Sequence, residues 1–478
     1  MLQKNFKFVF YDYETFGINP CLDKPFQFSC IKTDFDFNIL SSNVSFFCLP
    51  PIDYLPNIES IFITQISPLC LLKKKYFNEY FFAKKIYKIF IQNNTCIVGY
   101  NNFYFDDEFT RNIFYRNFFD PYSWSWKNNN SRIDILIILR AYYSFRPENI
   151  VWPKNKKNGL VSFKLSDFTK NNNISHKEIH NAKYDVYATV SVAKFLKKKN
   201  KGLFLYLFKN RFKKNILQII YKNFWKPIFF SSSLFHTKNF NLSLVLFLFI
   251  HPKNSNIAIM FNLTNSVSDF INYFNSRNCK NIFNIKDLFS FGILFIYLNK
   301  SPVLAPLSIA RKIDMNRINF SLEKKFARIS KIRSVWKIFL LLKKFFFKEN
   351  LFYKKKQDVD LMIYSGFLNS YDKQLMYKVH DFNKKKNFLK KNILFDDDRM
   401  NKLFFRFKAR HFKNLLTYKE KIIWKKHCFK VFNKNFLLQY IYNLKNNLKK
   451  YYKDKKKIFL IKQVFLYMKY VINIIKNY

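Results

Sequence analysis

The stretch that decides the fold is Val9-Phe10-Tyr11-Asp12-Tyr13-Glu14-Thr15-Phe16-Gly17, close to the start of the 478-residue chain. Its alternation predicts a β-strand over 6–14, with Phe10, Asp12 and Glu14 on one face. Phe10 would be buried, and the two acids would emerge together at the end of the strand where open α/β sheets bind ligands. Adjacent carboxylates repel each other, so a hard cation such as Mg²⁺ or Mn²⁺ would stabilise them. Taken alone, the motif also fits a solvated strand end.

A second acidic element is Gly99-Tyr100-Asn101-Asn102-Phe103-Tyr104-Phe105-Asp106-Asp107-Glu108. We expect a strand over 96–100, an Asn-rich turn, and a helix over 106–119. Asp106 is the candidate third carboxylate. Asp107 and Glu108 are explained by the favourable interaction of acids with a helix N-terminus.

The third element is His180-Asn181-Ala182-Lys183-Tyr184-Asp185-Val186-Tyr187-Ala188-Thr189. His180 is expected in a loop and Asp185 in the first turns of a helix over 184–196. The other six histidines lie in no comparable acidic setting. A loop histidine without a role is the alternative for His180.

Together, Asp12, Glu14, Asp106, His180 and Asp185 resemble, residue by residue, the DnaQ-like (DEDDh) 3′→5′ exonucleases. Other stretches resemble the single-strand-specific exonuclease I family within that group. These stretches are 11–17, 99–102, 105–115, 120–126, 146–148, 185–189, 299–305 and 364–367. The similarity is dense over about 10–190 and sparse afterwards.

The resemblance implies three parts. An RNase H-like (DnaQ-like) α/β exonuclease domain with a mixed sheet is followed by an SH3-like β domain and an all-α C-terminal domain. Strands first and alternating helices later favour a mixed α/β sheet independently. Lys-rich runs at 197–202 and 353–357 place the boundaries, giving domains 1–200, 201–355 and 356–478. Short apolar runs in the middle part predict strands, and Thr417 begins a predicted helix with a capping box.

The resemblance also implies the chemistry. Phosphodiester hydrolysis is served by two metal ions about 4 Å apart. Asp12, Glu14 and Asp185 would hold two Mg²⁺ ions, with Mn²⁺ as a substitute, and Asp106 would complete the metal shell directly or through water. His180 would take the proton from the attacking water. The expected activity is release of 5′-mononucleotides from single-stranded DNA, in DNA repair and recombination.

Substrate contacts should combine aromatic stacking with phosphate binding, because a nuclease that moves along a strand cannot read its bases. By resemblance, the expected DNA contacts are Glu14, Arg111, Tyr122, Trp126, Arg140, Lys164 and Lys300. The family pattern has Arg at the position of Lys164, and Lys cannot form a bidentate phosphate contact. Family members also bind the acidic C-terminal tail of single-stranded-DNA-binding protein, and Arg146 matches the family there.

The composition fits a nucleic-acid partner. Lys and Arg total 84 against 31 acids, a formal charge of +53. Such an excess favours a polyanion, with an anionic membrane surface as the second candidate. Because Lys accompanies abundant Phe, Tyr, Asn and Ile, whose codons are A/T-rich, part of this charge reflects genome composition.

The remaining features predict a cytoplasmic, monomeric protein without a membrane partner. The seven cysteines never form C-x-x-C, which favours free thiols in a reducing compartment. No signal peptide precedes the first acidic motif. The longest uncharged apolar runs, 242–250 and 288–298, are about half the length that spans a bilayer.

Two other functions remain open from the residues. One is a single-strand-binding protein that has lost catalysis, which the intact five-residue set disfavours. The other is a nuclease that acts on RNA ends or proofreads for a polymerase. The long region after residue 200 disfavours a lone proofreading domain.

Overall fold

The computed structural model describes residues 6–74, 76–278, 284–309, 321–348, 358–380 and 393–477. Cys279 and the predicted boundary at 353–357 lie outside these residues. By their contacts, the chain segments form two compact units that do not follow chain order. Unit 1 comprises Met1–Arg132, His176–Tyr187 and Lys355–Tyr478, and unit 2 comprises Ile133–Ser175 and Ala188–Lys354. The six described cysteines are free.

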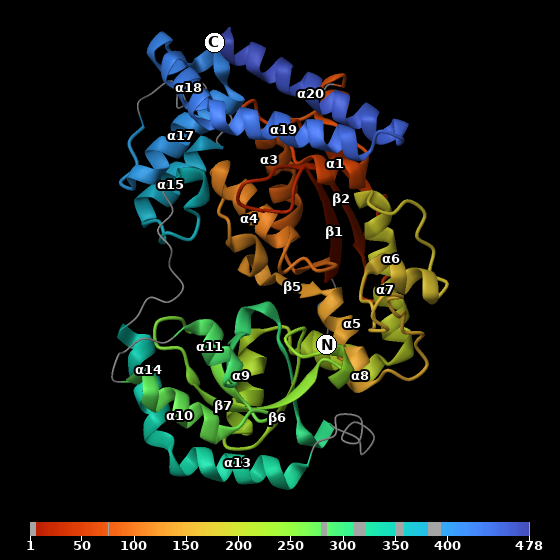
Figure 1. Ribbon diagram of the computed structural model, residues 1–478, viewed down its shortest axis with the longest axis vertical. Coiled ribbons are helices and arrows are strands. Elements are labelled where there is room, and N and C mark those ends of the chain that lie inside the picture. The colour runs from red at the N-terminus through yellow and green to blue at the C-terminus, as the bar shows by residue number, and fades with distance from the viewer. Residues whose placement is uncertain are drawn as a thin grey trace. The chain divides into compact units, whose positions relative to one another are not determined.

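The predicted mixed sheet is confirmed. Its strand order is β3-β2-β1-β4-β5, and β1 pairs antiparallel with β2 and parallel with β4. Asp12 faces Ser29 and Glu14 faces Gln27 across the β1–β2 pair. The strands are β1 (Lys7–Thr15), β2 (Pro25–Thr33), β3 (Val44–Phe47), β4 (Thr95–Gly99) and β5 (Ser131–Asp134) (Figure 1).

Helices from both ends of the chain cover this sheet and form its core. Tyr11 and Phe28 pack with apolar residues of α3 and α4, and residues of α15 and α17 join the same cluster. Burial of this continuous aromatic and aliphatic surface makes the main favourable contribution to the folding free energy of this core. The helices are α3 (Glu79–Phe90), α4 (Asp106–Arg116), α15 (Ser370–Val379) and α17 (Asp398–His411).

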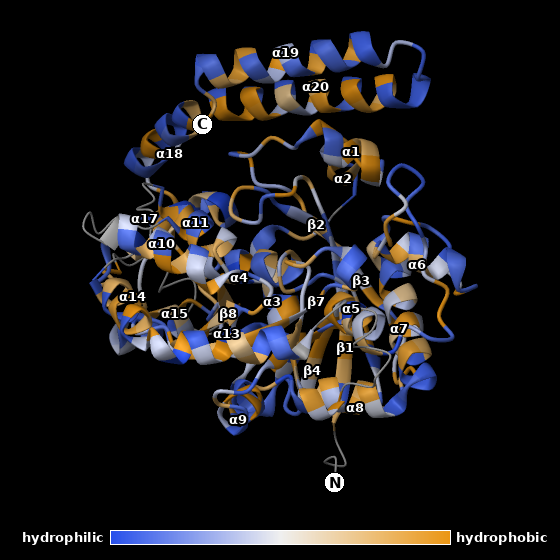
Figure 2. Cartoon of the chain, turned by 60° about the horizontal axis from the view of Figure 1, so that its bottom comes forward, coloured by the Kyte–Doolittle hydropathy of each residue, from blue (hydrophilic) through white to orange (hydrophobic). Residues whose placement is uncertain are grey.

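The C-terminal helices are amphipathic. α19 and α20 lie side by side, and hydrophobic residues alternate with hydrophilic ones along both (Figure 2). α20 is long and apolar enough to cross a membrane, but Leu460, Val464 and Val471 are buried against the rest of unit 1. Its composition therefore has a packing explanation. The helices are α1 (Ile58–Thr64), α2 (Pro68–Leu72), α18 (Tyr418–Val431), α19 (Lys434–Lys450) and α20 (Lys455–Lys476). The predicted capping box at Thr417 and Glu420 is confirmed.

A tight turn places Asp106 beside β1. Asn101 adopts a left-handed φ of 63°, which Asn tolerates better than most residues. A Cβ at Gly99 would lie 2.7 Å from Cβ of Asn102, so the backbone approach requires glycine. The Asp107 amide then donates to the Asn102 carbonyl at 2.9 Å, where α4 begins.

Unit 2 contains a second sheet of five strands in the order β10-β6-β7-β8-β9, and every pair in it is antiparallel. The predicted strands of the middle region are confirmed. The strands are β6 (Ile228–Ser231), β7 (Leu242–Ile250), β8 (Ile257–Asn262), β9 (Ile293–Tyr297) and β10 (Val303–Pro306). Among the described residues, the α-helices that lie wholly in unit 2 are α5 (Ile135–Phe145), α6 (Leu165–Asn171), α8 (Lys201–Lys209), α9 (Lys213–Lys222), α10 (Val267–Asn278), α11 (Ile285–Ser290), α13 (Leu322–Ser334) and α14 (Trp336–Lys348).

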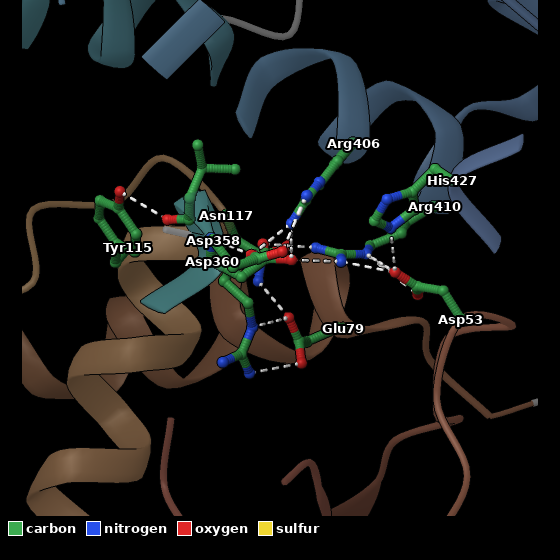
Figure 3. Close-up of polar contacts among 11 residues, drawn as sticks. Asp53, Glu79, Tyr115, Asn117, Asp358, Asp360, Arg406, Arg410 and His427 are labelled. Atoms are coloured by element: carbon green, nitrogen blue, oxygen red, sulfur yellow. Dashed lines mark hydrogen bonds and ion pairs between the residues drawn. The ribbon is translucent and has the colours of Figure 1, made fainter. Parts of the chain in front are cut away.

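A buried ion network ties the C-terminal helices to the N-terminal part of unit 1 (Figure 3). Arg410 on α17 donates to Asp53 at 2.6 Å and to Asp360 at 2.6 Å. Glu79 accepts a bidentate pair from Arg116 at 3.1 and 2.9 Å. Although burial opposes ionisation, Arg116 and its neighbours lower the pKa of Glu79 to about 2, and Arg410 lowers the pKa of Asp53 and Asp360.

Arg410→Met should therefore lower the free energy of unfolding by about 3–5 kcal/mol, because it removes the cation that two buried carboxylates share, although Asp360 keeps Arg406 at 2.7 Å. The depressed pKa values mean that this stability is present above the ordinary carboxyl range near 4 and is lost as pH falls further. The difference between variant and wild type, measured by urea unfolding, should consequently narrow below about pH 4. Lys457→Met, which removes a half-buried pair with Asp454 at 3.6 Å, should change stability less. An equal effect of both variants would contradict this account.

Candidate active site

Three of the predicted carboxylates converge at the end of β1. Asp12 and Glu14 come from this strand, and Asp185 comes from the first turn of α7 (Ala182–Lys199). One ligand oxygen from each lies within 4.8 Å of the other two. Glu14 is only 8% exposed. Hard oxygen donors at this spacing suit a divalent cation such as Mg²⁺ or Mn²⁺.

Asp106 lies next to this group but is not one of the three. It is the first residue of α4 and is 2% exposed. Its Oδ1 accepts a hydrogen bond from the Tyr13 amide at 3.2 Å, between the two acids of β1. Asp106 therefore links the start of α4 to the strand that carries the site.

The electrostatics of the cluster favour a bound cation. Burial raises the pKa of Asp12, and the charges of Asp106, Asp185 and Glu14 raise it further. Burial likewise raises the pKa of Glu14, with added repulsion from Asp185 and Asp106. A divalent cation relieves both the repulsion and the loss of hydration, so protons and cation compete for these oxygens.

Asp107 and Glu108 have structural partners. Asp107 accepts hydrogen bonds from Tyr11 at 2.5 Å and from Asn102 at 3.0 Å, and it pairs with Arg132. Glu108 pairs with Arg111 at 2.6 Å. These contacts go beyond the helix-terminus effect that the sequence indicated.

The structure does not bring His180 into the three-carboxylate group. His180 lies in the turn before α7, exposed, with a left-handed φ of 64°. The loop position agrees with the prediction. A proton-accepting role for its imidazole stays a prediction.

The prediction that no other histidine has an acidic setting is wrong. Nε2 of His176 lies 2.6 Å from Oδ1 of Asp185, and both side chains are largely buried. The loop that precedes α7 folds back so that a residue nine positions earlier contacts the helix. The only sequence signal was a second histidine four residues before His180.

Two of the predicted stacking residues line an apolar cavity of about 440 Å³ in unit 1, together with Phe367. Trp126 is 65% exposed and Phe367 is 88% exposed. The Tyr122 and Phe367 rings are 6.2 Å apart, and the Tyr122 hydroxyl donates to the Ile363 carbonyl at 3.1 Å. Phe367 was predicted only as a family landmark, and the structure adds it to this aromatic surface.

The predicted phosphate contacts have different surroundings. Arg111 forms an ion pair with Glu108 and donates a hydrogen bond to the Tyr364 hydroxyl at 3.4 Å. In unit 2, Lys164 is exposed, Arg140 lies 5.6 Å from the Phe163 ring, and Lys300 lies 5.8 Å from the Tyr297 ring. Arg146, also in unit 2, donates to the Ile309 carbonyl at 3.3 Å. Their contacts with DNA or a partner stay predictions.

Comparisons with known proteins agree with this arrangement. Family models match in the order of the expected parts: an exonuclease model over 9–193, an exonuclease I SH3-like domain over 211–348, and an exonuclease I C-terminal domain over 357–471. The chain is 45% identical to exodeoxyribonuclease I of Buchnera aphidicola (Schizaphis graminum) over 469 residues, 98% of this chain and 96% of that protein. It is 37% identical to the Escherichia coli K12 protein, covering 97% and 98% of the two chains.

The chain belongs to the exodeoxyribonuclease I family. It is therefore a hydrolytic exonuclease, as the five-residue set predicted. The predicted fold class and the order of the three parts are confirmed, whereas the boundaries after residues 200 and 355 stay predictions.

Solved structures of exodeoxyribonuclease I match 98% of the chain. The E. coli protein in complex with a dA16 oligonucleotide has a TM-score of 0.90 at 36% identity, with 98% of this chain and 100% of that chain covered. A zinc-bound form of its complex with single-stranded DNA scores 0.89, and a structure of SSB/exonuclease I with an inhibitor scores 0.88, both at the same identity and coverage.

Proposed function

We propose that this protein is a Mg²⁺-dependent 3′→5′ exonuclease that degrades single-stranded DNA to 5′-mononucleotides. The observation that carries the proposal is the convergence of Asp12, Glu14 and Asp185 at the end of β1. A family relative solved with a DNA oligonucleotide supports the choice of substrate. Mn²⁺ would replace Mg²⁺, because both prefer oxygen ligands.

The proposed mechanism assigns one task to each residue. When bound, two divalent ions would neutralise the scissile phosphate and lower the pKa of the attacking water. Asp12, Glu14 and Asp185 would hold these ions. Asp106 fixes the β1 backbone through the Tyr13 amide and adds negative charge next to the metal ligands. His180, exposed on its loop, accepts the proton of the water.

DNA binding would combine aromatic faces with positive charges. Trp126 and Tyr122 offer stacking surfaces that tolerate any base, and Phe367 extends them. Arg111, Arg140, Lys164 and Lys300 would contact phosphates, and Glu14 would contact the terminal nucleotide. The high positive charge of the chain supports binding to a polyanion.

The cellular role, location and partner of the protein are proposed mainly from its family. A role in DNA repair and recombination follows the family resemblance, and a cytoplasmic location, which the free thiols support, and a monomeric state are proposed with it. The acidic tail of single-stranded-DNA-binding protein is the proposed protein partner, and the solved SSB/exonuclease I structure supports it.

One assay tests the proposal against both alternatives. Single-stranded DNA and RNA of the same sequence, each labelled at the 3′ end, are incubated with the full-length protein and Mg²⁺, with and without a chelator. The proposal expects mononucleotide release from DNA only, abolished by the chelator. Release from RNA at an equal rate would favour an RNA-end nuclease. Binding of DNA without release would favour a binding protein.

Trp126→Ala should weaken single-stranded DNA binding by about 1–3 kcal/mol, the usual contribution of one stacking platform. The effect should be similar for dA, dT and mixed strands, since every base has a π-face. Affinity is measured by fluorescence anisotropy in the presence of a chelator, which prevents cleavage. Trp124, 1% exposed two positions earlier, is the contrast, because Trp124→Ala should instead destabilise the fold. An unchanged affinity in folded Trp126→Ala would exclude Trp126 from DNA binding.

A further inference from the structure

The loop before α7 holds a second histidine against the acidic cluster. Nε2 of His176 lies 2.6 Å from Oδ1 of Asp185, and the His176 side chain is only 4% exposed. We propose that His176 is a positioning residue that orients Asp185 for metal binding. This inference rests on the metal-dependent activity proposed above and assigns the support of one of its ligands.

The chemistry of the contact defines its direction. An ionised carboxylate only accepts hydrogen bonds, so the imidazole donates through Nε2–H. A carboxylate offers about four lone-pair sites, so a hydrogen bond from His176 is compatible with a cation on the same carboxylate. Hydrogen bonds from buried partners to metal ligands fix ligand orientation, and losing such a partner typically costs 10–100-fold in metal affinity.

The geometry separates His176 from His180. The His176 ring is buried and its Nε2 is occupied by Asp185, so it is poorly placed to exchange protons with a water on the substrate. His180 is exposed in the turn four residues later. The two histidines of this loop would therefore have different roles. His176 orients the metal ligand Asp185, and His180 accepts the proton of the attacking water.

The other end of the loop is anchored separately. Asn181 accepts from Gln27 of β2 at 3.3 Å and donates to Glu178 at 2.9 Å. The residues between His176 and Asn181 are thus held to the site at both ends. The His176 end contacts the carboxylate of Asp185 directly, which makes it the end that should control metal affinity.

The test measures metal binding rather than activity. Free Mn²⁺ is titrated against the full-length protein without DNA and detected by its electron paramagnetic resonance signal. His176→Ala should bind Mn²⁺ about 10–100-fold more weakly than wild type. His176→Gln, whose amide can donate from nearly the same position, should recover most of the loss. His180→Ala is the matched control and should keep wild-type Mn²⁺ affinity.

Two results would overturn the inference. One is wild-type Mn²⁺ affinity in His176→Ala, and the other is a folded His176→Gln that binds no better than the alanine variant. Thermal unfolding in chelator checks the fold of each variant. If His176→Ala does not fold, His176→Asn replaces it, because its shorter amide cannot reach Asp185. Failure of the wild-type protein itself to bind Mn²⁺ would instead reject the proposed metal site.

Discussion

Asp12→Asn should lower exonuclease turnover by at least about 10³-fold, the upper range for losing one group that stabilises transition-state charge. The change removes one of three clustered carboxylates and with it much of the attraction for a second cation. Single-stranded DNA affinity in chelator should stay the same or rise, because one negative charge near the phosphates is lost. Asp185→Asn should behave in the same way, since its oxygen belongs to the same group.

The measurement is mononucleotide release from 3′-labelled single-stranded DNA at saturating Mg²⁺. Asp36→Asn is the control, because it makes the same change of charge at an exposed position of unit 1. It should cleave like wild type. Turnover above a tenth of the wild-type value in Asp185→Asn would mean that the metal-ligand assignment is wrong.

His180→Ala should lower turnover by about 10²–10⁴-fold, the usual contribution of general acid–base catalysis. DNA affinity and Mn²⁺ affinity should change little, because His180 is exposed and is not one of the clustered groups. Added imidazole should restore part of the turnover, since the small base can enter from solvent at an exposed position. The readout is turnover against imidazole concentration.

The control for imidazole rescue is His176→Ala, because the ring that it removes is buried and orients the metal ligand Asp185. Imidazole should not restore its Mn²⁺ affinity. If His180 has a purely structural role, His180→Ala should have a lower melting temperature than wild type, and imidazole should not restore its turnover. That outcome would remove His180 from the mechanism and leave the metal site intact.

The acids of the site were predictable because they depend on local structure. The alternation of β1 placed Asp12 and Glu14 on one face, and the strand-turn-helix at 99–108 placed Asp106 at a helix start. Asp185 followed from its position in the first turns of a predicted helix. Placing each acid on its element needed only the local sequence, whereas the expectation that the acids share one site came from the family resemblance.

Contacts between distant segments were not predictable. Arg410 and Asp53 are 357 residues apart, and nothing near either one indicates the pairing. His176 contacts Asp185 through a loop whose path no periodicity specifies. Phe367 joins Tyr122 from a segment more than 240 residues away along the chain.

The middle part was weakly predicted for a different reason. All but the last residue of β7 are buried, so its sequence lacks the alternation of apolar and polar residues that marks a strand with one solvent-exposed face. Its apolar run is as compatible with a buried helix as with a strand. The Lys-rich run at 197–202, used as a boundary, covers the end of α7 and the start of α8.

The most direct test of the metal site is anomalous diffraction from crystals of the protein soaked in Mn²⁺ with a single-stranded oligonucleotide. The account predicts two anomalous peaks, about 4 Å apart, among the carboxylates of Asp12, Glu14 and Asp185. The same soak of Asp12→Asn should lose at least one of them. Mn²⁺ bound elsewhere, with no peak among these three carboxylates in a crystal that contains the oligonucleotide, would contradict it.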